Sequence, residues 1–497
     1  MSINWVERSQ FVSHRICNFV DGSRESPSDG RKLSKYGPRD GRLLYQFGAS
    51  ATQDIETAVA TARRAYEDGR WSRLPVQQRK EVLLKLAALI EQHAEELALL
   101  ESLDVGKPIS DALSFDIPTS AAAVRFYGEA ADKYYGKVYC NDPSSLSYQL
   151  RRPIGVVAGI VGWNFPLVLA TGKLAPALMA GNCLVLKPSE LTPASTARLV
   201  ELALAAGVPK GVFNVIHGGP EVGAALAGHR QIDLVTFTGS THTGKALLKA
   251  AGESNMKRLI LECGGKAPNI VFDDSPDLDA VAEAVVARAF WNLGQVCTAS
   301  SRLLVQESIK DELLRLVIEK TAALRPGDPL DPASKFGALV SLAHQQRVLS
   351  YIDSGAEDGA QIVYRSEFRS PHESGFYLSP VIFDHVSPKM KIAQEEIFGP
   401  VLSVMSFDDE AMAIRIANDT IYGLSAIVWT KDLGRAHRIT QGIEAGWIVV
   451  NATGRPAGGP AEGVLSLGGQ KESGFGMEGG VEGLEAYTSN TAVQIFV

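Results

Sequence analysis

Apolar runs alternate with amphipathic stretches along most of the chain beyond residue 153. The run at 154–161 contains only apolar residues and glycine, which predicts a strand buried on both faces of a sheet. Further strands are predicted at 183–186, 212–216, 232–237 and 257–261, with helices between them at 166–179, 194–206, 221–227 and 243–251. Strands that alternate with helices in this way are typical of a parallel sheet covered by helices.

The same alternation continues after residue 267 and predicts a second α/β domain. Its strands are predicted at 269–272 and 302–306, and its helices at 278–292 and 309–323. Before residue 153 the pattern is different. Apolar residues at spacings of three and four predict one long helix over 76–104.

Two strand-like segments, 137–152 and 491–497, lie outside both α/β regions and have no core of their own. Unpaired strands of this kind expose backbone donors and acceptors that a neighbouring strand can use. We therefore expect the two segments to pair with each other or with another subunit.

Composition narrows the class of protein. A chain of 497 residues is long enough for about three domains, and its 45% of hydrophobic and 21% of charged residues are ordinary for a globular enzyme. The net charge of −7 excludes a general attraction to nucleic acid or to an anionic membrane. The longest apolar stretch, 153–163, is far shorter than the roughly 20 residues that span a bilayer. Because the first residues do not form a secretion leader and the five cysteines are scattered, we expect a cytoplasmic protein.

Two residues have the chemistry of a nucleophile and its base. Cys297 is a lone thiol just past a predicted helix, with small neighbours that leave room for a substrate. A free thiol is only about 3% ionised at pH 7, so a nucleophilic cysteine needs an activating group. Glu262 ends a predicted strand and precedes a pair of glycines, where a semi-buried carboxylate would have a raised pKa and could accept a proton. The alternatives are a structural cysteine and a capping or surface carboxylate.

Polar residues follow three other predicted strands, at the edge of a parallel sheet where sites gather. Asn164 either donates a hydrogen bond to a developing oxyanion or caps the next helix. Lys187 and Glu190 can hold a diol, and a carboxylate there would repel a 2′-phosphate, which favours NAD over NADP. The segment 237–244 joins a strand to a helix through a glycine turn that suits a pyrophosphate. The histidines and cysteines show no zinc-site spacing, so no metal is expected.

Taken together, these segments resemble the aldehyde dehydrogenase superfamily across nearly the whole chain. The motifs are W-N-F-P at 163–166, K-P-S-E at 187–190, F-T-G-S at 237–240, L-E-C-G-G-K at 261–266, G-Q-V-C at 294–297 and E-I-F-G-P at 396–400, in the family's order and approximate spacing. The resemblance implies an α/β fold in three parts. These are a Rossmann-like NAD-binding domain (1–133 and 153–264), an α/β catalytic domain (265–472) and a small β oligomerisation domain (134–152 and 480–497).

The resemblance also implies roles for individual residues. Cys297 would be the nucleophile, Glu262 the general base, and Asn164 would form the oxyanion hole with the main-chain N–H of Cys297; Lys173 completes the catalytic set. The cofactor would be NAD, held by Ile160, Trp163, Lys187, Glu190, Phe237, Gly239, Ser240, Glu396 and Phe398. The substrate tunnel would be lined by Phe165, Gly172, Val296, Thr298, Arg455 and Leu467.

Some positions depart from the family's pattern. Gly172 stands where many members have a tryptophan that lines the tunnel, which predicts a wider tunnel. The loop 451–465 is longer than usual and free of aromatic residues, and Arg455 within it either recognises an acidic group or faces solvent. Ser489 stands where a glutamate is common, and in relatives that glutamate can relay protons from the base through the helix lysine. The sequence leaves open whether this chain keeps such a relay.

The function implied is NAD-dependent oxidation of an aldehyde to the carboxylic acid through a cysteine thiohemiacetal and thioester. The wide tunnel favours a bulky or long-chain aldehyde of aromatic, ω-amino or guanidino type, and the stretch 251–258 is similar to bacterial amino- and guanidinobutyraldehyde dehydrogenases. The alternatives are a CoA-acylating enzyme, whose members lack the base glutamate, and a non-catalytic member of the fold. The resemblance also implies a homo-oligomer, either a dimer or a tetramer, with no nucleic-acid or membrane partner.

Overall fold

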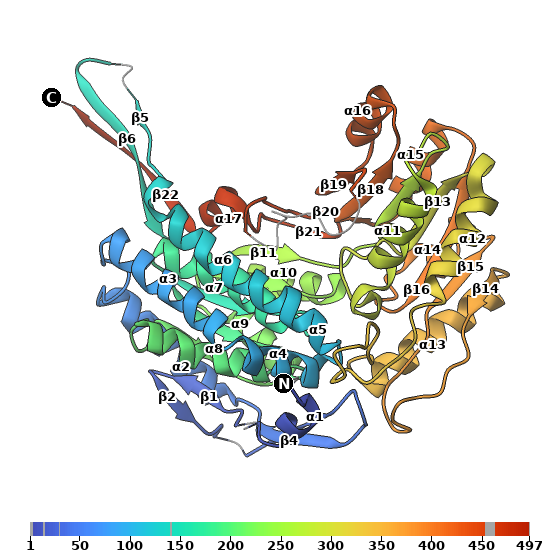
Figure 1. The fold of residues 1–497 in the computed structure, drawn as a ribbon. Helices are drawn as coiled ribbons and strands as arrows, with labels where there is room; N and C mark the ends of the chain where they lie inside the picture. The colour runs from blue at the N-terminus through green and yellow to red at the C-terminus, as the bar shows by residue number, and fades with distance from the viewer. Residues whose placement is uncertain (1–2, 13–14, 29, 140–141, 453–462, 497) are drawn as a thin grey trace.

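The computed structural model describes residues 3–12, 15–28, 30–139, 142–452 and 463–496. Two sheets, each packed against helices, form the cores of the two parts of the molecule that lie side by side in Figure 1. The predicted α/β architecture is therefore confirmed on both sides of residue 264.

The first sheet has eight strands in the order β2-β1-β9-β8-β7-β10-β11-β21. Its central strands are parallel and match the five predicted ones: β7 (Val156–Ile160), β8 (Cys183–Lys187), β9 (Phe213–Val215), β10 (Leu234–Thr238) and β11 (Arg258–Glu262). The helices that connect them are α7 (Pro166–Ala180), α8 (Ala194–Ala206), α9 (Pro220–Gly228) and α10 (Thr241–Ser254). Antiparallel strands close the edges: β1 (Asn18–Val20), β2 (Ser23–Glu25) and β21 (Gly474–Phe475).

The strand order changes direction between β7 and β10, which is the switch point of the first sheet. From β7 the chain moves outward through β8 to β9, and it then returns to the other side of β7 to form β10. The loops that leave β7 and β10 therefore diverge, and the carboxyl ends of strands at such a switch point are where doubly wound sheets bind ligands. Asn164 lies in the loop after β7, and Ser240 begins the helix after β10.

The second sheet has seven strands in the order β14-β15-β16-β13-β12-β18-β19, parallel except for β14. Its strands are β12 (Pro268–Val271), β13 (Arg302–Gln306), β14 (Gln361–Arg365), β15 (Val381–Asp384), β16 (Val401–Phe407), β18 (Ser425–Trp429) and β19 (Trp447–Val450). Its helices are α11 (Leu278–Phe290), α12 (Lys310–Thr321), α13 (Leu342–Glu357), α14 (Lys391–Gln394), α15 (Glu410–Asn418) and α16 (Leu433–Gly442).

The long helix predicted over 76–104 is wrong in one respect, because the structure contains two helices, α3 (Val76–Gln92) and α4 (Ala94–Val105). The chain bends at His93, whose φ of −99° and ψ of 22° are not helical. Every residue of α4 from Leu97 onward is buried, whereas α3 keeps one face exposed. A straight helix could not lie on the surface and also pass through the interior, so the chain must turn between the two.

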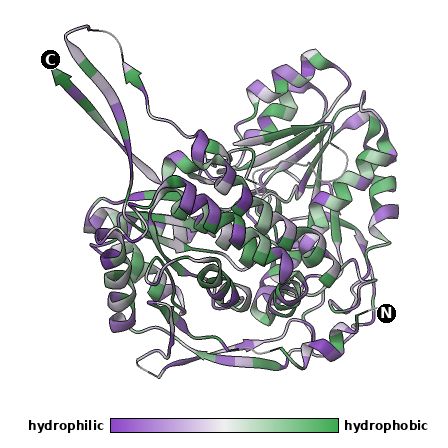
Figure 2. Ribbon diagram, turned by 60° about the vertical axis from the view of Figure 1, so that its left-hand side comes forward, coloured by the Kyte–Doolittle hydropathy of each residue, from purple (hydrophilic) through white to green (hydrophobic). Residues whose placement is uncertain are grey.

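The two outlying strand segments pair with each other, which is one of the two arrangements that the sequence predicted. Strand β22 (Thr488–Phe496) runs antiparallel to β6 (Ser145–Pro153), and β5 (Val138–Tyr139) pairs with the other side of β6. The arm that they form projects from the body in both Figure 1 and Figure 2. Several apolar side chains on it are exposed: Val138, Leu146, Ile495 and Phe496.

The remaining elements are shorter or flank the first sheet. They are α1 (Trp5–Ser9), β3 (Lys32–Tyr36), β4 (Leu43–Gly48), α2 (Thr52–Glu67), α5 (Ile109–Asp111), a π-helical turn (Ala112–Asp116), α6 (Ile117–Ala130), β17 (Tyr422–Gly423), β20 (Gln470–Lys471) and α17 (Gly480–Ala486). Within the described ranges, we find no helix with the length and hydrophobicity needed to cross a bilayer.

Candidate functional site

The predicted nucleophile, base and oxyanion donor come together where loops of the two sheets meet. The side-chain amide of Asn164, after β7, donates to the main-chain oxygen of Gln295 at 3.0 Å, two residues before Cys297. Glu262 ends β11, and Gly265 follows three residues later with its Cα against the main-chain oxygen of Cys297. Residues that are up to 133 positions apart in sequence, from 164 to 297, therefore lie close together.

The glycine pair after Glu262 makes this convergence possible. A side chain on Gly264 would overlap the carboxylate of Glu396, and one on Gly265 would overlap the Cys297 carbonyl. The N–H of Gly265 donates to Glu396 Oε1 at 3.0 Å. The lack of side chains at both positions lets the first sheet approach both the Cys297 segment and the Glu396 segment.

The electrostatics around Cys297 disfavour its thiolate. Burial raises the pKa of the thiol to about 12, and the negative charges of Glu396 and Glu262 act in the same direction. Hydrogen bonds from the main-chain N–H groups of Thr298 and Cys297 only partly oppose this shift in the pKa. In this arrangement the thiol is protonated at neutral pH, and it needs a base or a nearby positive charge to react.

We expect alkylation of Cys297 to be slow at neutral pH and to accelerate as the pH rises. Because its pKa is raised to about 12, the thiolate fraction should grow about tenfold per pH unit between about pH 6 and pH 10. The rate of inactivation by iodoacetamide measures this fraction, with a Cys297→Ala variant to subtract labelling of other cysteines. A plateau near neutral pH would contradict the expectation.

Glu262 lies in a buried line of alternating charges. Its side chain is 6% exposed, and its Oε1 has no hydrogen-bond partner among the described residues. Burial, and next the charge of Glu478, raise its pKa well above the ordinary value, while Lys173 lowers it. Lys173 on α7 forms an ion pair with Glu478 and donates to Thr236 Oγ1 at 3.1 Å. A buried carboxyl of this kind binds a proton more readily than an exposed one, which suits a general base.

The carboxylate beside Lys173 does not come from position 489, where relatives commonly have a glutamate. Ser489 lies on β22, where its hydroxyl contacts the main-chain oxygen of Arg152 at 3.5 Å. Glu478 pairs with Lys173. No sequence motif indicated Glu478, which stands in a glycine-rich stretch between β21 and α17. The loss of a glutamate at 489 therefore does not leave Lys173 without an acidic partner.

The predicted cofactor residues of the first sheet lie at the carboxyl ends of its strands or just after them. Lys187 donates to the main-chain oxygen of Pro188 at 3.1 Å and lies 3.5 Å from Glu190 Oε2. Lys187 is buried, whereas about a third of the Glu190 side chain is exposed. A donor and an acceptor thus stand together at one end of the crevice, as two ribose hydroxyls require.

Glycine keeps the space beside these groups open. A side chain at Gly223 would come within 3.8 Å of both Ile160 and Lys187, and one at Gly239 would strike the ring of Phe237. Ser240 caps α10 and accepts from the N–H of Thr243 at 3.2 Å. An exposed helix N-terminus bordered by glycine fits a pyrophosphate, so the residues present fit a dinucleotide cofactor.

Glu396 and Phe398 approach the crevice from the second sheet. Burial raises the pKa of Glu396 to about 7. Phe398 has a left-handed φ of 60°, and its ring lies 5.1 Å from that of Trp163. His344, which no sequence motif indicated, donates from Nε2 to the Phe398 carbonyl at 2.7 Å and packs against Trp163. This contact fixes a strained residue directly at the predicted cofactor site.

Aromatic rings form a wall beside Cys297. The ring centroid of Phe165 lies 5.7 Å from that of Phe115 and 5.1 Å from that of Trp291, and Phe115 and Trp291 are 4.7 Å apart. Val296, the neighbour of Cys297, packs against this cluster. Of the three rings only Phe165 was predicted, because Phe115 and Trp291 stand in a π-helical turn and at a helix end that carry no motif.

The other predicted tunnel residues have different surroundings. A side chain added at Gly172 would meet no atom within 4 Å, so there is open space at this position. Leu467 forms a β-bridge with Glu478, and Thr298 follows Cys297 directly. Arg455 lies outside the described residues, so its prediction is untested.

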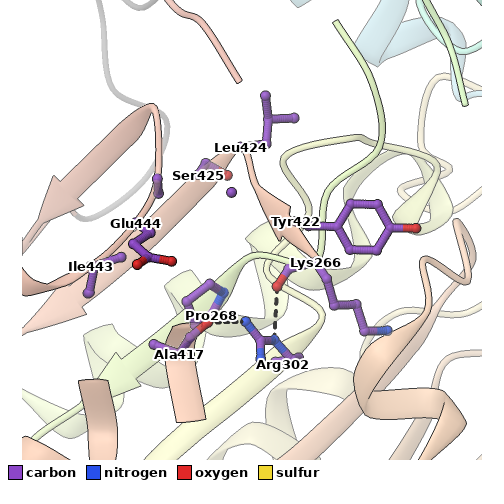
Figure 3. A pocket seen from close by; sticks show the side chains of 11 residues that line it. Lys266, Pro268, Arg302, Ala417, Tyr422, Leu424, Ser425, Ile443 and Glu444 are labelled. Carbon is purple, nitrogen blue, oxygen red and sulfur yellow. Dashed lines mark hydrogen bonds between the residues drawn. The ribbon is translucent and has the colours of Figure 1, made fainter. Parts of the chain in front are cut away.

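A separate cavity at the amino-terminal ends of β12, β13 and β18 contains none of the predicted site residues (Figure 3). It is lined in part by Lys266 and Arg302. The Arg302 guanidinium donates to the main-chain oxygens of Lys266, Ile416 and Ala417 at 2.8–3.0 Å. Its N–H groups are therefore already hydrogen-bonded within the fold. Among the described residues, no cluster of side chains could hold a metal ion.

The chain is similar to known proteins over nearly its whole length. The aldehyde dehydrogenase family model matches residues 25–493. The chain is 45% identical to the NADP/NAD-dependent aldehyde dehydrogenase PuuC of Escherichia coli over 99% of this chain and 98% of that protein. It is 45% identical to an aminoacetaldehyde dehydrogenase of Pseudomonas aeruginosa over 92% and 91% of the two chains.

The fold of the chain is also similar to that of solved structures. A crystal structure of indole-3-acetaldehyde dehydrogenase with NAD+ superposes with a TM-score of 0.96 at 47% identity, and the match covers 99% of both chains. A gamma-glutamyl-gamma-aminobutyraldehyde dehydrogenase from Burkholderia cenocepacia also superposes with a TM-score of 0.96, at 43% identity and 99% coverage of both chains.

Proposed function

Because this chain belongs to the aldehyde dehydrogenase family, and is therefore an enzyme that oxidises aldehydes with a nicotinamide cofactor, we propose that Cys297, Glu262 and Asn164 carry out the reaction. We further propose that the substrate is a bulky aldehyde with an aromatic or amino group. The observation that carries the first proposal is the meeting of a thiol, a buried carboxyl and a side-chain amide in one crevice.

In the first half-reaction the Cys297 sulfur forms a bond to the aldehyde carbon, and the thiol proton passes to Glu262. The electron pair of the C=O double bond moves to oxygen. The Asn164 amide and the Cys297 main-chain N–H donate hydrogen bonds to that oxyanion, and the loss of one such donor typically costs about 10²–10³-fold in rate. A bound nicotinamide ring supplies the acceptor for the hydride that leaves the tetrahedral carbon. The acyl group then remains on Cys297 as a thioester.

In the second half-reaction Glu262, ionised again, takes a proton from water, and the water oxygen attacks the thioester carbon. The C–S bond breaks, Glu262 returns this proton to the sulfur, and the carboxylic acid leaves. For Glu262 to act as a base here, the proton that it took from the thiol in the first half-reaction must already have reached solvent. We propose that Lys173 and Glu478 conduct it, since Lys173 is paired with Glu478 and both act on the Glu262 carboxyl.

We propose that Lys187 and Glu190 hold the adenosine ribose, Ser240 contacts the pyrophosphate, and Glu396 and Phe398 contact the nicotinamide riboside. Ile160, Trp163, Phe237 and Gly239 would line the same cleft. A carboxylate next to the ribose repels a 2′-phosphate, so NAD is preferred to NADP. One similar protein is named as NADP/NAD-dependent, so the use of both cofactors should be measured.

The Glu190→Gln substitution should raise the relative use of NADP. It removes a negative charge that is partly exposed near Lys187, and a surface-accessible charge pair is worth about 1 kcal/mol, or roughly a fivefold change in preference. The ratio of kcat/KM for NADP to that for NAD measures the effect. An unchanged ratio would show that Glu190 does not face the 2′ position, and Glu221→Gln, at the start of the neighbouring helix, serves as a control.

The aromatic wall supports a bulky substrate. Phe115, Phe165 and Trp291 form an aromatic wall that suits a large apolar or aromatic group, and the open position at Gly172 leaves room for it. Two similar proteins are named for indole-3-acetaldehyde and for gamma-glutamyl-gamma-aminobutyraldehyde, which both carry large groups. We propose that this enzyme accepts aldehydes of aromatic, ω-amino or guanidino type.

A tryptophan at position 172 should discriminate against large aldehydes. In the Gly172→Trp variant the indole would fill the open space and block a bulky group, at a cost of about 10–100-fold in kcat/KM for indole-3-acetaldehyde. Acetaldehyde, which does not reach the wall, should be much less affected. Steady-state kinetics with both substrates provide the measurement, and an equal loss with both would contradict a tunnel role for Gly172.

NADH formation from a panel of aromatic, ω-amino and short aliphatic aldehydes, in the absence of coenzyme A, tests the proposed function. The presence of Glu262 favours hydrolysis of the thioester over transfer to coenzyme A. NADH formation that required coenzyme A would favour the acyl-transferring alternative. A folded, reduced enzyme that is silent on the whole panel would favour the non-catalytic one.

We also propose a homo-oligomer, either a dimer or a tetramer, built through the projecting arm. Val138, Leu146, Ile495 and Phe496 are exposed on it, and a partner strand or helix would cover them. Light scattering with a Phe496→Asp variant would test the assembly.

The first sheet with its helices (1–133 and 153–264) would act as the cofactor domain, and residues 265–472 would act as the catalytic domain. We also propose that the protein is located in the cytoplasm.

A further inference from the structure

The backbone that leads to Cys297 has an unusual conformation. Asn292, Leu293 and Gly294 follow one another with φ angles of 48°, 59° and 70°, all in the left-handed region. Glycine adopts this region freely and asparagine tolerates it, whereas leucine is strained there. Asn292 and Leu293 are also buried, at 3% and 1% exposure. Strain of this kind persists only where the surrounding contacts fix the backbone.

Three buried amide side chains supply those contacts, and we call Asn164, Asn292 and Gln295 the amide cage. Asn292 Nδ2 donates to the main-chain oxygen of Asn164 at 3.2 Å. Gln295 Nε2 donates to the main-chain oxygen of Asn292 at 3.2 Å, and Gln295 Oε1 accepts from the N–H of Val340 at 3.1 Å. Asn164 Nδ2 closes the cage by donating to the main-chain oxygen of Gln295 at 3.0 Å.

The cage constrains both donors of the proposed oxyanion hole. The Asn164 amide has two N–H bonds, and the one directed at Gln295 fixes the plane of the amide while the other is left for an oxyanion. The second donor, the N–H of Cys297, lies two residues beyond Gln295 in the same braced segment. Their separation therefore depends on the hydrogen bonds of the cage.

We propose that Asn292 and Gln295 are positioning residues of the oxyanion hole, which hold the Asn164 amide and the Cys297 N–H at a fixed separation. The inference rests on the proposed role of Asn164 and goes beyond it, because it assigns a function to two residues that act through the cage. Donors fixed in advance need no reorganisation during the reaction, and a displacement of about 1 Å can cost about 100-fold in rate.

The Asn292→Gly variant tests this role. It removes the amide and keeps a residue that adopts a left-handed backbone. We expect kcat/KM to fall by about 10–100-fold both for aldehyde oxidation and for cofactor-free hydrolysis of p-nitrophenyl acetate, because both reactions form an oxyanion. Alkylation of Cys297 by iodoacetamide forms no oxyanion, so its rate should not change, and NAD affinity should also be unchanged.

The Asn214→Ala variant is a matched control. Asn214 is a buried amide in the first sheet that donates to the main-chain oxygen of Gly211 at 2.7 Å and accepts from the N–H of Asp21 at 3.1 Å. Its loss should lower the melting temperature and leave turnover per folded molecule unchanged. The Gln295→Met variant removes the side-chain hydrogen bonds of Gln295 to Asn292 and Val340. If Asn292→Gly does not fold, the turnover of Gln295→Met tests the inference in its place.

Two results would overturn the inference. Full turnover in Asn292→Gly and Gln295→Met would show that the cage does not position the donors. A parallel fall in alkylation and turnover would place the effect on the thiol and not on the oxyanion hole. Failure of the proposed function would look different, because the wild-type enzyme would then form no NADH from the aldehyde panel, while ester hydrolysis would still report on the cage.

Discussion

The Cys297→Ala variant is expected to form NADH at least on the order of 10⁵-fold more slowly than the wild-type enzyme, because a nucleophile that carries the intermediate has no substitute. Among the described residues, Cys183 and Cys263 are free but buried thiols, and Cys17 precedes the first strand of the sheet. NAD binding should be retained, since other side chains border the cofactor crevice. NADH absorbance measures turnover, and calorimetry measures cofactor affinity.

A Cys183→Ala variant is the matched control for this substitution. Cys183 begins β8 and is fully buried, so its loss removes a sulfur atom from the core of the first sheet. This variant should be less stable but should turn over normally once folded. Turnover of wild-type magnitude in Cys297→Ala would mean that another group forms the covalent bond, and the proposed mechanism would be wrong.

Much of the scaffold could be predicted because it follows from local pattern. The apolar run of β7 must be buried on both faces, and a strand with that property needs neighbours and covering helices. The polar residues directly after such strands, such as Asn164 and Glu262, could then be placed at one edge of the sheet. The glycine pair after Glu262 lets other groups approach the backbone closely, and the structure identifies what approaches: Glu396 and the Cys297 carbonyl.

Other features could not be predicted, because they depend on contacts between distant segments. Glu478 lies beside Lys173 only because the segment after β21 returns to α7. Phe115 and Trp291 meet Phe165 from two different parts of the chain. The break at His93 likewise reflects the burial of α4, which no helical periodicity encodes. Each of these features is a tertiary effect that overrides a local signal.

The Glu262→Gln variant is expected to lower steady-state turnover by about 10²–10⁴-fold, the usual contribution of a general base. Glutamine preserves the shape of the side chain but cannot accept a proton from water. Hydrolysis of the thioester should therefore become the slow step. The thiol should remain reactive at alkaline pH, because the charge of Glu262 is one of the groups that raise the pKa of Cys297, and its removal makes the thiolate easier to form.

The slower hydrolysis of the thioester and the easier formation of the thiolate together predict a specific result at alkaline pH. NADH should appear in a rapid burst of about one equivalent per active site, followed by slow turnover, and mass spectrometry should find the acyl group on Cys297. A Glu485→Gln variant, which removes a surface carboxylate that is paired with Arg151 near the arm, should behave like the wild type. If Glu262→Gln released acid at the wild-type rate, then another group would be the base for hydrolysis. Glu478 would be the first candidate, because its charge acts on Glu262 and it is paired with Lys173.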